Sequence, residues 1–265
     1  MGRLHLPEIE DEKWCPKFIR QATTDILRVF YDIFNTYELA YKKISEIIDI
    51  TKSTQIVDCC SGSGGPIPHL RDYLNKNNKE FIPITLTDKY PNIACYEQLE
   101  ALYPNQIVGH RSPIDATNFP KEMTGLRTIF SSFHHFKPDE AIKVLKNAID
   151  NDAPIAIFET IHRSPADFLR AFLSPLFIPF IIPFSRNLNW RKIFFTYLIP
   201  IIPLTFAWDY IASIARTYSI KEMETLVAQL NAPHYEWEIG KEWSKQAKCY
   251  IYYLVGFPIK SSQNR

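Results

Sequence analysis

The clearest structural signal in the chain is the stretch Gln55-Ile56-Val57-Asp58-Cys59-Cys60-Ser61-Gly62-Ser63-Gly64-Gly65-Pro66. Its apolar start suits a buried strand, and its glycines allow a sharp turn that brings backbone N–H groups close to a ligand. Pro66 suits the first position of a following helix, where the N–H that proline lacks would have no partner. A strand, a glycine-rich turn and a helix in this order begin the nucleotide-type site of doubly wound α/β domains.

The details of this turn indicate which ligand it binds. A dinucleotide fingerprint has a third glycine, but Ile67 stands in that position. The carboxylate of Asp58 would repel a pyrophosphate and suits a cationic ligand with an amino group and a sulfonium centre. A P-loop is excluded, because no Gly-Lys-Ser/Thr follows. The segment resembles motif I of the class I S-adenosylmethionine-dependent methyltransferases, although Cys59-Cys60-Ser61 stands where many members carry a bulky apolar residue and then a glycine.

The rest of the chain predicts the sheet of that family. Apolar segments predict four further parallel strands, at 81–88, at 106–110, within 126–136 and at 153–160. A helix from Ser219 to about Leu230 with a capping box at Glu222, then two β-rich segments at 235–243 and 248–256, close the chain. We therefore expect an α/β fold with a doubly wound, Rossmann-like seven-stranded sheet, N-terminal helices and a helical apolar cap insertion.

The resemblance implies that S-adenosylmethionine is the cofactor. Asp88 ends the second strand at the distance from the glycines expected of an acid that binds ribose hydroxyls, with a solvated turn acid as the alternative. In the family, an acid and a small residue after the third strand contact the adenine ring, and Asp115 and Ala116 match them. The expected cofactor-binding residues are Asp58, Cys60, Ser61, Gly62, Gly64, Asp88, Lys89, Asp115, Ala116 and Ser131.

Four polar side chains are candidates for acid–base catalysis: His134, His135, Glu159 and Asp209. Adjacent histidines after the fourth strand are common in small-molecule members of the family. We expect at most one to face the substrate, because neighbouring side chains alternate along an extended backbone; the alternative is one packed and one solvated histidine. Asp209 ends an apolar run, which tends to raise a carboxyl pKa, and its alternative role is an ion pair with Arg216.

The composition indicates which partners and which cellular compartment to expect. The chain has 265 residues with Lys+Arg 30 against Asp+Glu 29, a net charge of +1, so we expect no nucleic-acid partner. The Asn/Asp-Pro-Pro-Tyr/Phe motif of amino-methylating DNA enzymes is missing. Five cysteines without Cys-x-x-Cys or Cys/His spacing predict a reducing compartment and no metal. The charged start, 1–13, has no apolar signal core, so a cytoplasmic location is expected.

The chain divides into an N-terminal helical region (1–50), a cofactor-binding core (51–165), an apolar cap insertion (166–217), the last helix and strand pair (218–258) and a tail (259–265). The N-terminal helices either cover the substrate side or bury one edge of the sheet. Trp14, Arg20 and Tyr31 are the side chains there with the best chance of ligand contact.

The insertion sets this chain apart. Its apolar arms, about 13 and 16 residues long, are shorter than the roughly 20 residues that cross a bilayer. Five prolines interrupt them further, so no transmembrane anchor is expected: Pro175, Pro179, Pro183, Pro200 and Pro203. Three roles stay open. In the first, the arms close over the cofactor and line an apolar substrate pocket. In the second, segment 168–208 dips into a membrane surface, with Arg170, Arg186, Arg191 and Lys192 near anionic head groups. In the third, a homodimer buries the arms.

Together these features predict an S-adenosylmethionine-dependent methyltransferase that acts on a hydrophobic small molecule or lipid-like acceptor by in-line transfer under the cap. One alternative is a non-catalytic protein with this fold that binds the cofactor or docks onto a membrane or a partner. The other is a nicotinamide-dependent reductase, which Asp58 and the missing third glycine disfavour.

Overall fold

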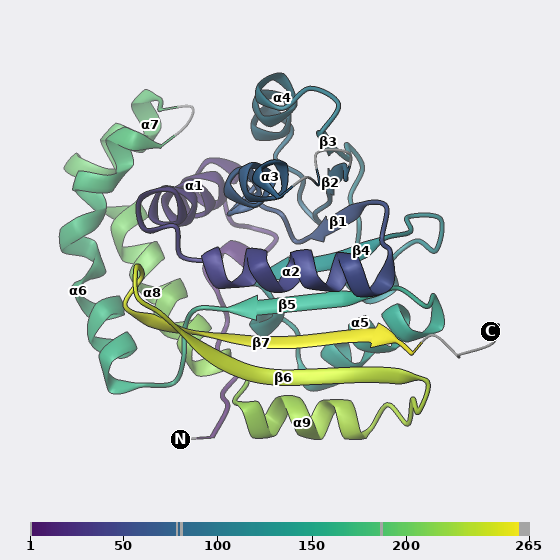
Figure 1. Cartoon of the computed structure of the whole chain (residues 1–265). Coiled ribbons are helices and arrows are strands. Elements are labelled where there is room, and N and C mark those ends of the chain that lie inside the picture. Colours follow the sequence, from purple (N-terminus) through teal and green to yellow (C-terminus); the bar gives the residue numbers. More distant parts are fainter. Residues whose placement is uncertain (1, 78, 80–81, 186–187, 260–265) are drawn as a thin grey trace, which may run out of the picture.

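The structure, a computed structural model, describes residues 2–77, 79, 82–185 and 188–259, so Phe81, Arg186 and the tail from 260 lie outside the described residues. Seven strands form one sheet in the order β3-β2-β1-β4-β5-β7-β6 (Figure 1). Strands β1 to β5 are parallel, and β7 runs antiparallel to both β5 and β6. The predicted α/β, Rossmann-like, seven-stranded sheet is therefore confirmed. The strand bounds are β1 Ile56–Cys59, β2 Ile84–Leu86, β3 Ile107–Gly109, β4 Leu126–Phe130, β5 Ile155–Glu159, β6 Tyr235–Ser244 and β7 Cys249–Pro258.

Helices cover both faces of the sheet, which explains why most residues of the parallel strands are apolar. Ile56 of β1 packs with helices α2 (Glu38–Thr51), α3 (Ile67–Lys76) and α4 (Ile93–Leu102) in one core cluster. The next residue, Val57, packs with α5 (Pro138–Asp150) and α9 (Ile220–Ala228) in a second cluster. Successive strand side chains point to opposite faces, so one strand supplies both cores.

The turn after β1 needs the small residues that the sequence places there. Gly62 and Gly64 have φ of 51° and 84°, and Cys60 has a φ of 59°, a left-handed conformation at the position where many relatives of the motif carry glycine. A Cβ on Gly64 would lie 2.4 Å from Cδ1 of Leu99 in α4. Pro66 is the residue that caps α3 rather than its first helical residue, one position from the prediction.

The N-terminal region contains more than helices. Helix α1 (Lys17–Phe34) and α2 match the predicted helical pair. The segment before them, however, is extended apart from one 3-10 turn, η1 (Ile9–Asp11). This segment, residues 2–16, is called the N-terminal strap below. It runs against helix α8 (Ile201–Arg216) and the turn that holds the two histidines, because Leu4 N–H donates to Ala215 O (2.9 Å) and Arg3 donates to the carbonyls of His134 and Phe136.

The insertion forms a helical cap beyond the carboxyl ends of the parallel strands (Figure 1). It consists of α6 (Pro165–Ile181), η4 (Ile182–Phe184), α7 (Trp190–Ile193), a π-helical turn η5 (Phe194–Leu198) and α8 (Ile201–Arg216). Ile178, Ile182, Ile202 and Phe206 of the cap pack with Ile26 and Ala22 of α1 in a third core cluster. The cap is thus joined to the N-terminal helices rather than to the sheet core.

The expectation that prolines break the first apolar arm is wrong. Helix α6 continues through Pro175 and Pro179. A proline leaves the carbonyl four residues earlier without its helical donor. Side chains replace two such donors: Ser174 Oγ donates to Ala171 O (2.7 Å), four residues before Pro175, and Tyr197 Oη donates to Pro179 O (2.5 Å), four residues before Pro183.

As a result, one helix is longer than the sequence predicted. Residues 165–184 are apolar and long enough to cross a membrane by length and composition, and 28% of that stretch is buried in the fold. The pair formed by 190–198 and 201–216 passes the same test within the described residues but is bent by 79°. One such helix is weak support for a membrane span. Most of its surface is exposed, however, and is free to contact a membrane or another protein.

Candidate active site

Two cavities adjoin each other at the carboxyl ends of the parallel strands. The first, about 870 Å³, is called the turn cavity, because Cys60 and Gly62 of the glycine-rich turn line it. The second, about 570 Å³, is called the apolar cavity and is lined mainly by α1, α6 and α8. Glu10 and His135 line both cavities. These two side chains therefore belong to a shared wall, across which ligands in the two cavities would face each other.

Six of the ten expected cofactor residues line the turn cavity: Cys60, Gly62, Asp88, Lys89, Asp115 and Ala116. Asp88 is positioned by two backbone bonds, because its carboxylate accepts from Gly62 N–H and from Tyr90 N–H, both at 2.7 Å. Burial raises the pKa of Asp88. Each carboxylate oxygen has a further lone pair, so Asp88 can still accept hydroxyl groups of a ligand.

Asp115 and Ala116 lie at the start of a 3-10 turn, η2 (Ala116–Asn118). The Asp115 carboxylate accepts from Thr117 N–H (2.9 Å) and Thr117 Oγ1 (2.7 Å). Its other oxygen lies 3.5 Å from Lys89 Nζ. These contacts hold the loop after β3 in a single arrangement at the edge of the turn cavity.

The other four expected cofactor residues lie elsewhere. Asp58 is buried beneath the turn, where it accepts from Ser61 Oγ (2.6 Å) and Thr128 Oγ1 (2.7 Å). Ser61 and Gly64 do not line the turn cavity, although they shape the loop that does. Ser131 lines the apolar cavity and shares hydrogen bonds with Tyr37 Oη (2.5 Å) and Thr160 Oγ1 (3.1 Å).

Asp58 should make stability depend on pH. Burial raises its pKa to about 7, against partial opposition from the Ser61 and Thr128 hydroxyls. The native state then keeps a proton that the unfolded chain releases near pH 4. The stabilisation that this proton gives the native state is complete below about pH 4 and is lost as the pH rises through about 7. Over this interval the free energy of unfolding falls by about 1.4 kcal/mol per pH unit. We expect Asp58→Asn to remove this slope. Urea unfolding at pH 5, 6, 7 and 8 tests this, and parallel curves for the two proteins would contradict it.

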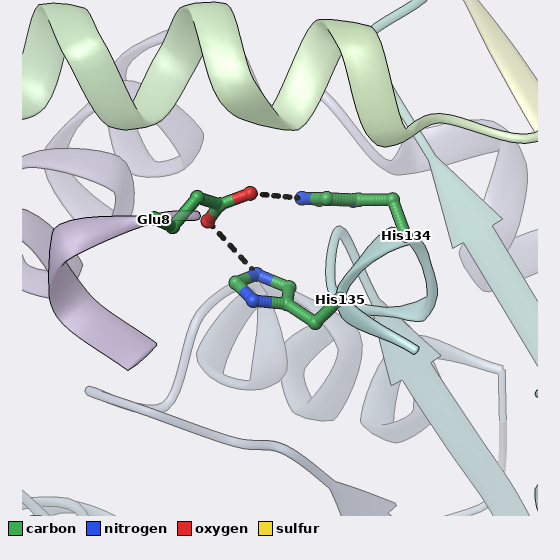
Figure 2. A group of neighbouring side chains, drawn as sticks. All are labelled: Glu8, His134 and His135. Carbon is green, nitrogen blue, oxygen red and sulfur yellow. Dashed lines mark ion pairs between the residues drawn. The ribbon is translucent and has the colours of Figure 1, made fainter. Parts of the chain in front are cut away.

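The two histidines lie side by side, which corrects the expectation that at most one could face the site. They sit in a 3-10 turn, η3 (Phe133–His135), and not in an extended segment, so their rings lie 4.5 Å apart and both point toward Glu8 (Figure 2). His134 also lines the apolar cavity. The 3-10 turn of residues 133–135 therefore places both rings on the same side, whereas the extended backbone assumed from the sequence would have placed them on opposite sides.

Each imidazole is held by a carboxylate at Nδ1. His134 Nδ1 lies 2.9 Å from Glu159 Oε2, and Glu159 also accepts from His134 N–H (3.1 Å). His135 Nδ1 lies 3.0 Å from Asp11 Oδ1. Burial would lower the pKa of His135, but Glu8, Asp11 and Glu10 outweigh it and raise that pKa to about 10. Glu159 is thus a partner of His134 behind the wall and lines neither cavity.

Asp209 does not pair with Arg216, the alternative left open by the sequence. Its carboxylate accepts from Ile9 N–H (2.6 Å) and Glu10 N–H (3.3 Å), and so it holds the start of η1. Burial raises the pKa of Asp209 to about 7. Arg216 instead contacts Glu8 (3.1 Å) and Asp11 (2.6 Å). Asp209 lines the apolar cavity, with both oxygens engaged by the strap.

The N-terminal strap supplies the functional residues that the sequence did not reveal. Glu8 and Glu10 are buried or nearly so at the wall, and Asp11 lines the turn cavity. An acidic run at a chain terminus is typical of a solvated segment, so no local signal could have placed it here. Among the three side chains singled out in the N-terminal region, Arg20 lines the turn cavity, Tyr31 lines the apolar cavity, and Trp14 is exposed and lines neither.

Comparison with known proteins supports the fold. No family model and no curated protein matches this sequence. Among solved structures, that of the plantazolicin methyltransferase BpumL in complex with SAH is 12% identical, with a TM-score of 0.51 over 89% of this chain and 85% of that one. The methyltransferase domain of bacterial CtHen1-C is 12% identical, with a TM-score of 0.50 over 85% of this chain and 98% of that domain. At such identities the likeness establishes the fold.

Proposed function

We propose that this chain, which has the fold of the class I methyltransferases, transfers the methyl group of S-adenosylmethionine to a hydrophobic acceptor. The observation that carries the proposal is the pair of cavities that share Glu10 and His135 in their common wall. A cofactor in the turn cavity and an acceptor in the apolar cavity would meet at this wall. Direct transfer between two bound ligands needs such an arrangement.

The turn cavity has the chemistry for S-adenosylmethionine. Asp88 would accept the ribose hydroxyls, and Ala116 and Asp115 would border the adenine ring. Acidic side chains, Asp88 and Asp115 among them, and basic ones, Lys17, Arg20 and Lys89 among them, line the cavity together, which suits a cofactor that carries a sulfonium, an ammonium and a carboxylate. BpumL, which shares this fold, is described as bound to SAH, the product of such a transfer.

The apolar cavity has the composition of a pocket for a hydrophobic acceptor. Most of the exposed surface of its lining is apolar, with Leu27, Phe30, Leu173, Phe177 and Phe206 as contributors. Its volume of about 570 Å³ lies within the range of about 300–1,000 Å³ typical of small-molecule sites. The polar groups of its lining include the two histidines of the wall, so an acceptor hydroxyl would find its partners there.

The reaction needs little covalent chemistry from the protein. The sulfonium already makes the methyl group electrophilic, and holding the nucleophile in line with the C–S bond can supply about 7–11 kcal/mol of the barrier. The apolar lining excludes water from the acceptor side. The histidines and carboxylates of the wall are in place to activate the acceptor.

The outer face of the cap fits a membrane surface that contains anionic lipids. Within the described residues of 165–216, both carboxylates, Asp167 and Asp209, are buried, whereas Arg170 and Arg191 are exposed. The expectation that Lys192 lies near head groups is wrong, because Lys192 is buried and pairs with Asp25 of α1 (2.5 Å). Docking there would let a lipid-like acceptor enter the apolar cavity without crossing water. Among the described residues of 165–216, fifteen large apolar side chains are exposed: Leu169, Phe172, Leu176, Phe177, Phe180, Phe184, Leu188, Trp190, Ile193, Tyr197, Leu198, Ile199, Ile201, Leu204 and Trp208.

Ligand-induced stabilisation tests the cofactor first. S-adenosylmethionine or S-adenosylhomocysteine at about 100 times its dissociation constant should stabilise the protein by about 2.7 kcal/mol. This corresponds to a rise in Tm of several degrees, at roughly 2–4 °C per kcal/mol. NAD and NADP should give no shift. A shift with a nicotinamide alone would contradict the proposal and support a reductase.

Methyl transfer itself is measured with isotope-labelled S-adenosylmethionine. The purified protein is incubated with a lipid extract or with a polar metabolite extract, and the organic and aqueous phases are analysed for label. We expect label in the organic phase only. Cofactor binding without transfer to either extract would favour the non-catalytic alternative.

A further inference from the structure

The wall between the cavities contains a compact group of two imidazoles and a carboxylate (Figure 2). His134 Nε2 lies 3.8 Å from Glu8 Oε1, and His135 Nε2 lies 3.5 Å from Glu8 Oε2. One ligand atom from each of the three residues can be chosen so that all lie within 4.8 Å of one another. We propose that Glu8, His134 and His135 bind a divalent transition-metal ion, with Zn²⁺ as the best match to two imidazole nitrogens and a carboxylate.

The spacing of the three side chains fits such an ion. Ligand atoms at about 2.0–2.2 Å from a tetrahedral Zn²⁺ lie roughly 3.3–3.6 Å apart. The separation of 3.5 Å between His135 Nε2 and Glu8 Oε2 lies in this range, and the ligand atoms of all three residues lie within 4.8 Å of one another. Both separations from Glu8, 3.5 Å and 3.8 Å, are long for a hydrogen bond between these groups.

Two atoms of the group are buried and lack a partner that an ion would supply. His134 is 2% exposed and Glu8 is fully buried. Within the described residues, His134 Nε2 and Glu8 Oε2 have no hydrogen-bond partner. Leaving a buried polar group unpaired costs about 1–3 kcal/mol, so native proteins rarely leave two together. A metal ion at this point would coordinate both atoms.

Neighbouring carboxylates orient both imidazoles toward the proposed ion. Glu159 lies 2.9 Å from Nδ1 of His134, and Asp11 lies 3.0 Å from Nδ1 of His135. These contacts favour a proton on each Nδ1. A bound metal ion would displace the proton that Glu8 stabilises on Nε2 of His135, and both Nε2 lone pairs would then be directed at the ion. Histidine ligands of metals usually have this carboxylate support on the other ring nitrogen.

The charge of the surroundings also favours a cation. Within the described part of the chain, ion pairs link the two imidazoles to Glu8, Glu10, Asp11 and Glu159, and one guanidinium, that of Arg216, joins them. Even with a protonated His135 counted beside Arg216, four carboxylates face two cations, so negative charge is in excess around the imidazoles. Arg216 Nη1 (3.1 Å) and Ser213 Oγ (3.0 Å) both contact Glu8 Oε1, so Glu8 Oε2 is the oxygen left for the metal.

The role of the ion rests on the proposed function. His134 and His135 line the apolar cavity, so an open coordination position would face the acceptor. A hydroxyl bound there would have a lowered pKa and would pass its proton to the carboxylate of Glu10, which lines both cavities. The resulting oxygen anion attacks the methyl carbon: the O–CH₃ bond forms, the S–CH₃ bond breaks, and its electron pair stays on sulfur to give the neutral thioether.

Metal binding is tested without cofactor or acceptor. The full-length protein, made without a histidine tag and stripped with a chelator, is titrated with Zn²⁺ by calorimetry and with Co²⁺ by visible absorption. We expect one ion per chain. Glu8→Gln and His135→Gln should weaken binding by at least the roughly 10–100-fold that loss of a supporting contact costs, which is also the loss expected for Glu159→Gln. His234→Gln and Glu236→Gln, at exposed positions of the same residue types, should bind like the unchanged protein.

The outcomes separate this inference from the proposed function. Stoichiometric binding that the wall variants lose and the control variants keep supports the metal site, even if S-adenosylmethionine fails to bind. Absence of binding, or binding that Glu8→Gln leaves unchanged, overturns it, even if methyl transfer is observed. Far-ultraviolet circular dichroism of each variant shows that lost binding does not come from unfolding. His135→Gln serves as the second test if Glu8→Gln fails to fold.

Discussion

Replacing Asp88 by alanine should weaken the binding of S-adenosylmethionine by about 10²–10⁴-fold, because two hydrogen bonds to a charged carboxylate are lost at about 1.5–3 kcal/mol each. Asp88 lines the turn cavity and is held at the end of β2 by Gly62 and Tyr90 N–H groups. No other part of the proposed cofactor site combines a charge with two such anchors. Isothermal calorimetry on the purified variant gives the ratio directly.

Two further variants serve as controls for the effect of Asp88→Ala. Asp88→Asn keeps one oxygen acceptor and should bind more weakly than the unchanged protein but more tightly than Asp88→Ala. Asp150→Ala, which changes an exposed carboxylate at the end of α5, should leave the affinity unchanged. A loss of less than tenfold for Asp88→Ala would show that the ribose does not lie at this carboxylate.

Replacing Phe172, Phe180 and Phe184 together by serine should reduce binding to lipid vesicles by about 10³-fold. The three rings are 74%, 73% and 71% exposed and are spaced along one face of α6 and η4. Burial of a large apolar side chain is worth at least about 1.5 kcal/mol, so three rings contribute about 4 kcal/mol or more. Vesicles with phosphatidylcholine and phosphatidylglycerol, separated by sedimentation, measure the partition.

A matched triple variant distinguishes the cap from general surface hydrophobicity. Ile50, Leu102 and Val108 are 55%, 62% and 48% exposed and lie outside the cap. Their replacement by serine should leave vesicle binding unchanged. If the cap variant binds as tightly as the unchanged protein, membrane docking through this face is refuted. If the unchanged protein elutes as a dimer and the cap variant as a monomer, a second copy covers the face.

Most of the fold could be predicted because its signals are local. The β1 turn needs left-handed φ angles at Gly62 and Gly64, and residues that permit them are rare enough to identify the turn. The capping box of Ser219 and Glu222 formed as expected, since its hydrogen bonds, from Ser219 N–H to Glu222 and from Glu222 N–H to Ser219, span three residues. Apolar runs located the strands, most clearly β1, β4 and β5, because these three are buried along their whole length.

The prolines of α6 show the limit of local reasoning. A proline in a helix always lacks the N–H that would donate to the carbonyl four residues earlier. Whether the helix ends there depends on whether another group donates to that carbonyl. Here a hydroxyl from Ser174 and another from Tyr197 do so, and the second comes from a different element. The sequence contains both hydroxyls, yet their positions relative to the helix follow only from how the cap folds.

By itself, then, the sequence determined the sheet, the glycine-rich turn and the acid at the end of β2, because each depends on contacts within a few residues or on one periodic pattern. Tertiary structure alone decided the wall between the two cavities. Asp11 meets His135 across 124 positions, and Glu8 meets Ser213 across 205. Cysteine and histidine spacing could not reveal a metal site of this kind, since its ligands come from distant segments. The physical reason is that an acidic strap can be stable either in solvent or packed in a folded site. Its packing against α8 and η3 decides which of these two states it adopts.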